Sequence, residues 1–123
     1  MKQLFLVFLG GGLGSMLRYF IAKHLNLSDA SFFWGTFTVN ILGCLLIGVL
    51  LGCFTRGRWL TEQQLLLWAT GFCGGFTTFS TFAFEQQKLL KSGEILSFSL
   101  YTLGSVGIGI LAVSCGIWIS KSL

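Results

Sequence analysis

The sequence predicts an all-α integral membrane protein built from four transmembrane helices. Hydrophobic residues make up 54% of the 123 residues and charged residues only 10%, and the mean hydropathy is +0.82. A soluble domain carries about 25% charged residues, so this chain has too few charges to cover a soluble surface. A membrane-crossing helix needs about 20 mainly apolar residues. Apolar runs near this length cover residues 4–21, 32–54, 65–84 and 95–119.

The segments between these runs hold most of the charge, at residues 22–31, 55–64 and 85–94. Membrane-spanning strands alternate in polarity over about 10 residues, so continuous runs of this length indicate helices. Residues 1–123 are therefore predicted to form a single four-helix transmembrane domain. A net charge of +4 scattered between apolar runs offers no basic face for nucleic acid, and no nucleic-acid partner is expected.

Lys and Arg are balanced between the two sides of the predicted helices. Orientation is normally set by an excess of these residues on the cytoplasmic side, so a zero excess favours insertion in both orientations. Alternatively, the few charges nearest the first helix decide. Dual insertion suggests an antiparallel homodimer with its two-fold axis in the membrane plane. Each side carries four of these residues: Lys2, Arg56, Arg58 and Lys121 on one, and Arg18, Lys23, Lys88 and Lys91 on the other.

The first run, 4–21, carries a packing signal and a charge. Gly10 and Gly14 have the GxxxG spacing that lets helices approach closely, although a chain with 17 glycines also contains such pairs by chance. Arg18, near the end of the run, either snorkels to the lipid headgroups or draws anions into a vestibule. The same glycine spacing recurs at Gly48 and Gly52 and at Gly71 and Gly75.

Polar residues inside the second and fourth runs are candidates for a pathway. A polar side chain in hydrocarbon usually faces a partner or a water-filled cavity. Asn40 lies near the middle of the second run, with Thr36 one turn earlier on the same face. Tyr101 and Ser105 form a similar pair in the fourth run. The alternative is that these residues only make hydrogen bonds that join helices or return to their own backbone.

The third run is predicted to break at its midpoint, Gly74-Gly75. Paired glycines followed by hydroxyl residues are poor helix formers. Non-helical backbone at this depth is tolerated only where it is buried in protein or lines a cavity. In an antiparallel dimer, carbonyl groups from two chains would converge there into a cage for a hard monovalent or divalent cation. The alternative is a close-packed glycine crossing.

Phe79 and Phe82 share one face of the same run, with Thr78 and Thr81 offset by one residue. The edge of an aromatic ring is electropositive, so a ring edge can attract an anion without carrying a full charge. Neighbouring hydroxyls could replace part of the hydration shell of the anion. The alternative is plain aromatic packing.

Enzymatic chemistry is not expected. No Ser–His–acid, metal-ligating or phosphate-binding set is visible, and the four cysteines, without CxxC spacing, are expected to be packing residues. Glu85 lies at the end of the third run, so no carboxylate is expected well within a membrane-spanning helix. A proton-coupled carrier commonly uses such a buried acid.

The chain resembles the Fluc (CrcB) fluoride channels in three stretches, in order and over its whole length. The resemblance implies a passive, fluoride-selective channel that exports fluoride and lowers its toxicity. It also implies a dual-topology antiparallel homodimer with two pores in the inner membrane of a bacterium. The stretches are Gly11-Gly12-Leu13-Gly14 with Arg18-Tyr19; Gly35-Thr36 with Val39-Asn40 and Gly43; and Gly74-Gly75-Phe76-Thr77-Thr78-Phe79-Ser80-Thr81-Phe82.

The resemblance also implies roles for individual residues. Phe79 and Phe82 match pore-lining phenylalanines, and Asn40 matches the asparagine that supports them. The remaining matches are Ser80 and Thr81 as pore hydroxyls, Thr36 beside Asn40, Arg18 in the vestibule, Tyr101 and Ser105 as a polar track, and Gly74 and Thr77 as backbone ligands of a structural Na⁺. Gly109 and Val113 stand where a longer hydroxyl track is expected.

Two other functions remain open from the sequence. A small dual-topology multidrug exporter would share the length and helix count, but it needs an acidic residue in the first run, and 4–21 contains none. A non-transporting membrane assembly protein would use every polar residue merely to join helices.

Overall fold

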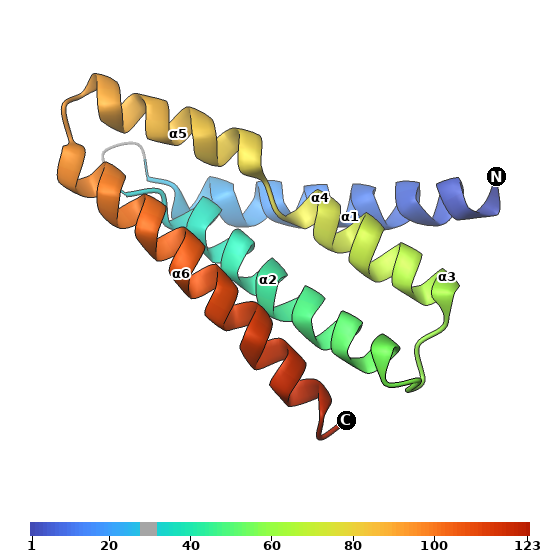
Figure 1. Ribbon diagram of the computed structural model, residues 1–123. Helices are drawn as coiled ribbons and strands as arrows, with labels where there is room; N and C mark the ends of the chain where they lie inside the picture. The colour runs from blue at the N-terminus through green and yellow to red at the C-terminus, as the bar shows by residue number, and fades with distance from the viewer. Residues whose placement is uncertain (28–31) are drawn as a thin grey trace.

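The computed structural model describes residues 1–27 and 32–123, which form helices and no strand (Figure 1). The three long helices are α1 (Lys2–Leu25), α2 (Trp34–Thr55) and α6 (Ile95–Ser120). Between α2 and α6 the chain forms shorter pieces: α3 (Glu62–Leu65), the π-helical segment η1 (Leu66–Cys73), α4 (Gly74–Phe76) and α5 (Phe79–Lys91).

The prediction of an all-α membrane protein is confirmed. Among the described residues, α1, α2 and α6 are the helices that are long and apolar enough to cross a membrane. α1 and α6 contain the predicted runs 4–21 and 95–119, and α2 covers most of 32–54. Part of the predicted connecting segment 22–31, Asp29 included, lies outside the described residues.

The third predicted run, 65–84, is divided between several pieces. Thr77 and Thr78 have extended backbone and separate α4 from α5. Gly74 and Gly75, where the sequence predicted the break, form part of α4 instead, so that location was wrong. Gly75 stays helical because it packs against α1, as described below.

The two threonines themselves end one helix and begin the next. The Cys73 carbonyl accepts hydrogen bonds from both the N–H and the hydroxyl of Thr77, at 3.0 and 2.9 Å. The hydroxyl of Thr78 accepts a bond from the Thr81 N–H at 3.2 Å and so caps α5. Hydroxyl residues favour such local bonds and N-caps over helix interiors.

Glycines let the long helices approach backbone to backbone. α2 and α6 run side by side for most of their length (Figure 1). A Cβ atom on Gly48 would collide with the Val113 carbonyl oxygen, and one on Gly116 would collide with the Leu45 carbonyl oxygen. Only glycine permits this separation, because any larger residue would push the two helices apart.

The contact between α1 and the η1–α4 stretch has the same cause. Cβ atoms on Gly10 and Gly14 would collide with backbone oxygens of Leu67 and Phe72, and one on Gly75 would collide with the Gly11 carbonyl oxygen. The close packing that the sequence predicts for the GxxxG pairs is therefore confirmed in this part of the fold.

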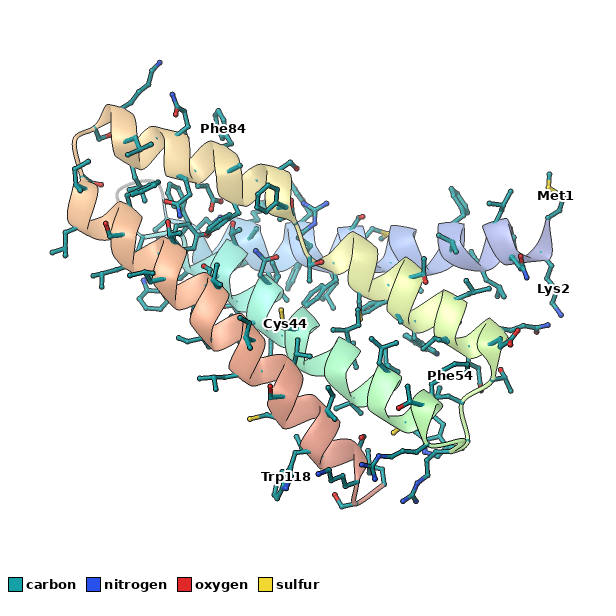
Figure 2. All side chains as sticks on the ribbon, in the orientation of Figure 1. Met1, Lys2, Cys44, Phe54, Phe84 and Trp118 are labelled. Atoms are coloured by element: carbon teal, nitrogen blue, oxygen red, sulfur yellow. The ribbon has the colours of Figure 1, made fainter. Side chains whose placement is uncertain are left out.

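The interior is small and the outer surface is apolar. A core cluster that includes Cys53 and Cys73 lies between α2 and the η1 segment, as expected for cysteines used in packing, and these thiols are free. Large apolar side chains such as Phe84 and Trp118 point away from the bundle (Figure 2), and Trp118 is 70% exposed. Such a surface fits hydrocarbon rather than water.

We expect Gly116→Ala to destabilise the protein by about 1–3 kcal/mol, the range for overpacked interiors, because its Cβ atom would meet the backbone of α2. Gly107→Ala is the matched control on the same helix, because nothing lies within 4 Å of its Cβ position. The better helix propensity of alanine should leave the control unchanged or more stable by up to about 1 kcal/mol. Thermal unfolding in detergent measures both; equal midpoints would contradict the packing argument.

Candidate functional site

A cavity of about 530 Å³ lies where the interruption between α4 and α5 faces α2 and α6. Cys44, labelled on α2 in Figure 2, is part of its wall. None of the side chains that line it among the described residues carries a charge. The cavity brings together six of the residues that the sequence singled out: Asn40, Gly74, Thr77, Phe79, Phe82 and Ser105.

Asn40 holds the interruption in place. Its side-chain oxygen accepts a hydrogen bond from the Thr78 N–H at 2.8 Å, and its Nδ2 donates to the Thr78 carbonyl oxygen at 3.2 Å. In a continuous helix the Thr78 N–H would bond to the carbonyl of Gly74. Asn40 thus replaces the missing helical partner, and it leaves the Gly74 carbonyl without that donor.

Phe79 and Phe82 form a tilted pair beside the cavity. Their ring centroids lie 6.1 Å apart with an interplanar angle of 42°. Phe82 meets the ring of Tyr101 nearly edge to face, at 4.9 Å and 76°. Phe79 is 79% exposed in the single chain, so its ring is open to whatever covers this face of the molecule.

The predicted pore hydroxyls separate into two groups. Ser105 lies on the cavity wall, and its hydroxyl oxygen is buried without a hydrogen-bond partner among the described residues. The hydroxyls of Ser80 and Thr81 instead lie 3.4 and 3.2 Å from the Thr78 hydroxyl, on the first turn of α5. Thr81 also lines a second cavity of about 330 Å³, together with Glu85 and Lys88.

Thr36 and Tyr101 are directed at a carboxylate and do not line the larger cavity. The Thr36 hydroxyl donates to Oε1 of Glu85, and the Tyr101 hydroxyl donates to Oε2 at 2.7 Å. Asn26 extends this network, because its Nδ2 donates to the Thr36 hydroxyl and its Oδ1 accepts from the Gly35 N–H at the start of α2. The structure therefore divides each predicted polar pair: Asn40 and Ser105 lie at the larger cavity, and their partners bind Glu85.

Glu85 is the residue that the sequence analysis missed. The segment 85–94 was expected to connect two helices, but α5 continues to Lys91, and Glu85 is only 4% exposed. The expectation that the chain holds no buried acid was wrong. The available signal for the burial of Glu85 was its position three residues after Phe82, on the same face of a helix. Its two hydroxyl donors come from other helices and carry no local signature.

Arg18, a residue of α1, is half-buried and contacts the end of α4. Its Nε donates a hydrogen bond to the Gly75 carbonyl oxygen at 3.0 Å, and the Ser15 hydroxyl donates to the same oxygen at 3.3 Å. This contact does not test the two roles left open from the sequence, snorkelling and anion attraction, and both stay predictions.

The chain matches the family described as CrcB-like protein, Camphor Resistance (CrcB), over residues 5–117. It belongs to the CrcB family. The resemblance found in the sequence is thereby confirmed, and the motif-bearing residues from Gly11 to Ser105 lie within the matched part.

CrcB relatives match the chain over nearly its full length. It is 52% identical to a protein of Phocaeicola vulgatus, with 98% of this chain and 100% of the relative covered. It is 43% identical to a protein of Gloeothece citriformis, with 98% of each covered. Identity to a protein of Flavobacterium psychrophilum is 42%, with 100% of each covered. Each of these relatives is named fluoride-specific ion channel FluC.

We expect Tyr101→Phe to destabilise the protein by about 1–3 kcal/mol, because it removes one of the two hydroxyl donors to the buried Glu85 carboxylate. Tyr19→Phe is the matched control, since Tyr19 lies exposed on α1 and should change stability little. Thermal unfolding of the two variants under the same conditions makes the comparison. If both behave like the unmodified protein, the hydrogen bond from Tyr101 to Glu85 contributes nothing to stability.

Proposed function

We propose that this chain is a fluoride-selective passive ion channel that exports fluoride and lowers its concentration in the cytoplasm. The observation that carries the proposal is the uncharged cavity, which is lined by Phe79, Phe82 and Ser105. The Ser105 hydroxyl is buried there without a hydrogen-bond partner among the described residues. Membership of the CrcB family, and 52% identity to a protein named as a fluoride-specific channel, support the same function.

The chemistry of the cavity suits a small, strongly hydrated anion. Fluoride must shed water to enter, and hydroxyl or amide donors together with electropositive ring edges can replace part of its hydration shell. Because no charged side chain lines the cavity among the described residues, the ion would be held weakly enough to leave. Conduction requires both properties.

We infer that two copies pair in antiparallel orientation to complete two pores. In a single chain the cavity has Gly74 and Phe79 exposed at its rim, and a second copy would cover this face. Equal numbers of Lys and Arg on the two sides favour insertion in both orientations. In this arrangement α1, α2, the interrupted stretch from η1 to α5, and α6 serve as four spans of a bacterial inner-membrane protein.

A structural Na⁺ at the centre of the dimer is part of this proposal. Gly74 and Thr77 both line the cavity, and the Gly74 carbonyl lacks its helical donor because the Thr78 N–H bonds to Asn40. Backbone carbonyl oxygens are suitable ligands for hard cations. One chain supplies too few of them, so the same residues of the second copy would complete the set.

A proton-coupled exporter is the alternative that one observation favours. Glu85 supplies the buried acid that such a carrier commonly uses. However, both of its oxygens accept hydrogen bonds, and it does not line the larger cavity. A passive channel would conduct fluoride without a pH gradient, whereas a coupled exporter would need one.

The deciding experiment is fluoride efflux from liposomes that contain the purified protein, with sodium on both sides and no pH gradient. Chloride-loaded liposomes and protein-free liposomes are the controls. We expect rapid fluoride release and no chloride release. A well-assembled protein that releases neither ion, or both, would contradict the proposed function.

We expect Phe82→Ile and Asn40→Asp to reduce fluoride efflux to the background of protein-free liposomes while the protein remains assembled. The first variant removes an aromatic ring from the cavity wall. The second replaces an amide donor with a negative charge beside the path of an anion. Phe84→Ile is the matched control, because Phe84 lies on the same helix, points outward and is 62% exposed. Normal efflux in either cavity variant would remove that residue from the mechanism.

A further inference from the structure

Arg18 contacts the backbone next to the interruption. Its Nε lies 3.0 Å from the Gly75 carbonyl oxygen, and the Ser15 hydroxyl lies 3.3 Å from the same atom. Both donors come from α1, one turn apart. The contact therefore joins α1 to the last turn of α4.

The Gly75 carbonyl needs outside donors because of where α4 ends. In a continuous helix it would accept a bond from the N–H of Phe79, but two extended residues separate Phe79 from α4. The last carbonyls of a helix have to be satisfied by side chains, water or ligands. Arg18 and Ser15 supply side-chain donors that meet this requirement.

In the sequence, Gly75 lies between Gly74 and Thr77, the residues whose backbone carbonyls are the proposed ligands of Na⁺. Gly75 packs so closely on Gly11 that a Cβ atom would collide with the Gly11 carbonyl oxygen. It follows Gly74 directly and precedes Thr77 by two positions in the sequence. A donor that fixes the Gly75 carbonyl therefore also restricts these neighbouring peptide groups, which line the cavity.

We propose that Arg18 is a positioning residue, which supports conduction through the Gly75 carbonyl and does not act by attracting fluoride. This inference rests on the proposed channel function. On this proposal, the rate of fluoride conduction depends on the hydrogen bond from Nε to the Gly75 carbonyl, and the positive charge of Arg18 contributes little to it.

Two substitutions separate the hydrogen bond from the charge. Arg18→Gln places an amide nitrogen on Cδ, where arginine has Nε, so it keeps a donor at that position and loses the charge. Arg18→Lys keeps the charge but has a methylene group at that position. Lys23→Gln, further along α1 and exposed to solvent, is the control for loss of a nearby cation.

The measurements are the maximal rate of fluoride efflux and its half-saturating fluoride concentration, at low and high ionic strength. We expect Arg18→Lys to reduce the maximal rate roughly five- to tenfold, as for one lost hydrogen bond. Arg18→Gln should stay within about threefold of the unmodified protein, with no added salt dependence. The reverse order, with Arg18→Lys normal and Arg18→Gln showing a raised half-saturating concentration, would overturn the proposal.

Ser15 gives an independent test that changes no charge. Ser15→Ala removes the second donor to Gly75 and should lower the maximal rate in the same direction as Arg18→Lys, whereas Ser15→Thr should restore it. A normal rate in Ser15→Ala together with a normal rate in Arg18→Lys would also overturn the inference.

Failure of the proposed function is distinguishable, because the unmodified protein would then release no fluoride. In that case thermal unfolding tests the hydrogen bond from Arg18 Nε to the Gly75 carbonyl on its own. If Arg18→Gln is more stable than Arg18→Lys, the role of this bond is supported, and the opposite order refutes it.

Discussion

The backbone at Thr77 and Thr78 has to find its hydrogen bonds inside the protein, because a membrane provides no water to supply them. An unpaired N–H or C=O group in an apolar environment costs several kcal/mol. Asn40 satisfies both groups of Thr78 with one side chain. These two bonds replace the helical partners that the Thr78 backbone loses at the interruption.

The glycine contacts make this arrangement possible. They bring α1 onto η1 and α4 and bring α2 onto α6 with their backbones in contact, so the cavity is bounded by closely packed helices. The contact of α1 with α4 also explains why Gly75 stays helical despite its low helix propensity. The chain breaks two residues later, at Thr77 and Thr78, whose hydroxyls make local hydrogen bonds.

The polar groups of the interior divide according to the charge they face. Asn40 and Ser105 lie at a cavity that no charged side chain lines in the described part of the chain, where in the proposed channel their donors would face the anion. Thr36 and Tyr101 are committed to Glu85, because a buried carboxylate is stable only when its oxygens accept hydrogen bonds. Arg18 belongs to neither group, because its hydrogen bond goes to the Gly75 carbonyl oxygen.

The sequence by itself determined the class of the protein. Apolar runs of membrane-crossing length predict the long helices, since length and hydropathy alone decide whether a helix can cross a bilayer. The motif from Gly74 to Phe82 indicated where the site would lie, and Asn40, Phe79, Phe82 and Ser105 do meet there. Only the tertiary structure decided the place of the break, the burial of Glu85 and the partner of Arg18. Each of these depends on hydrogen bonds between residues far apart in the chain, and no periodicity along one helix reveals such partners.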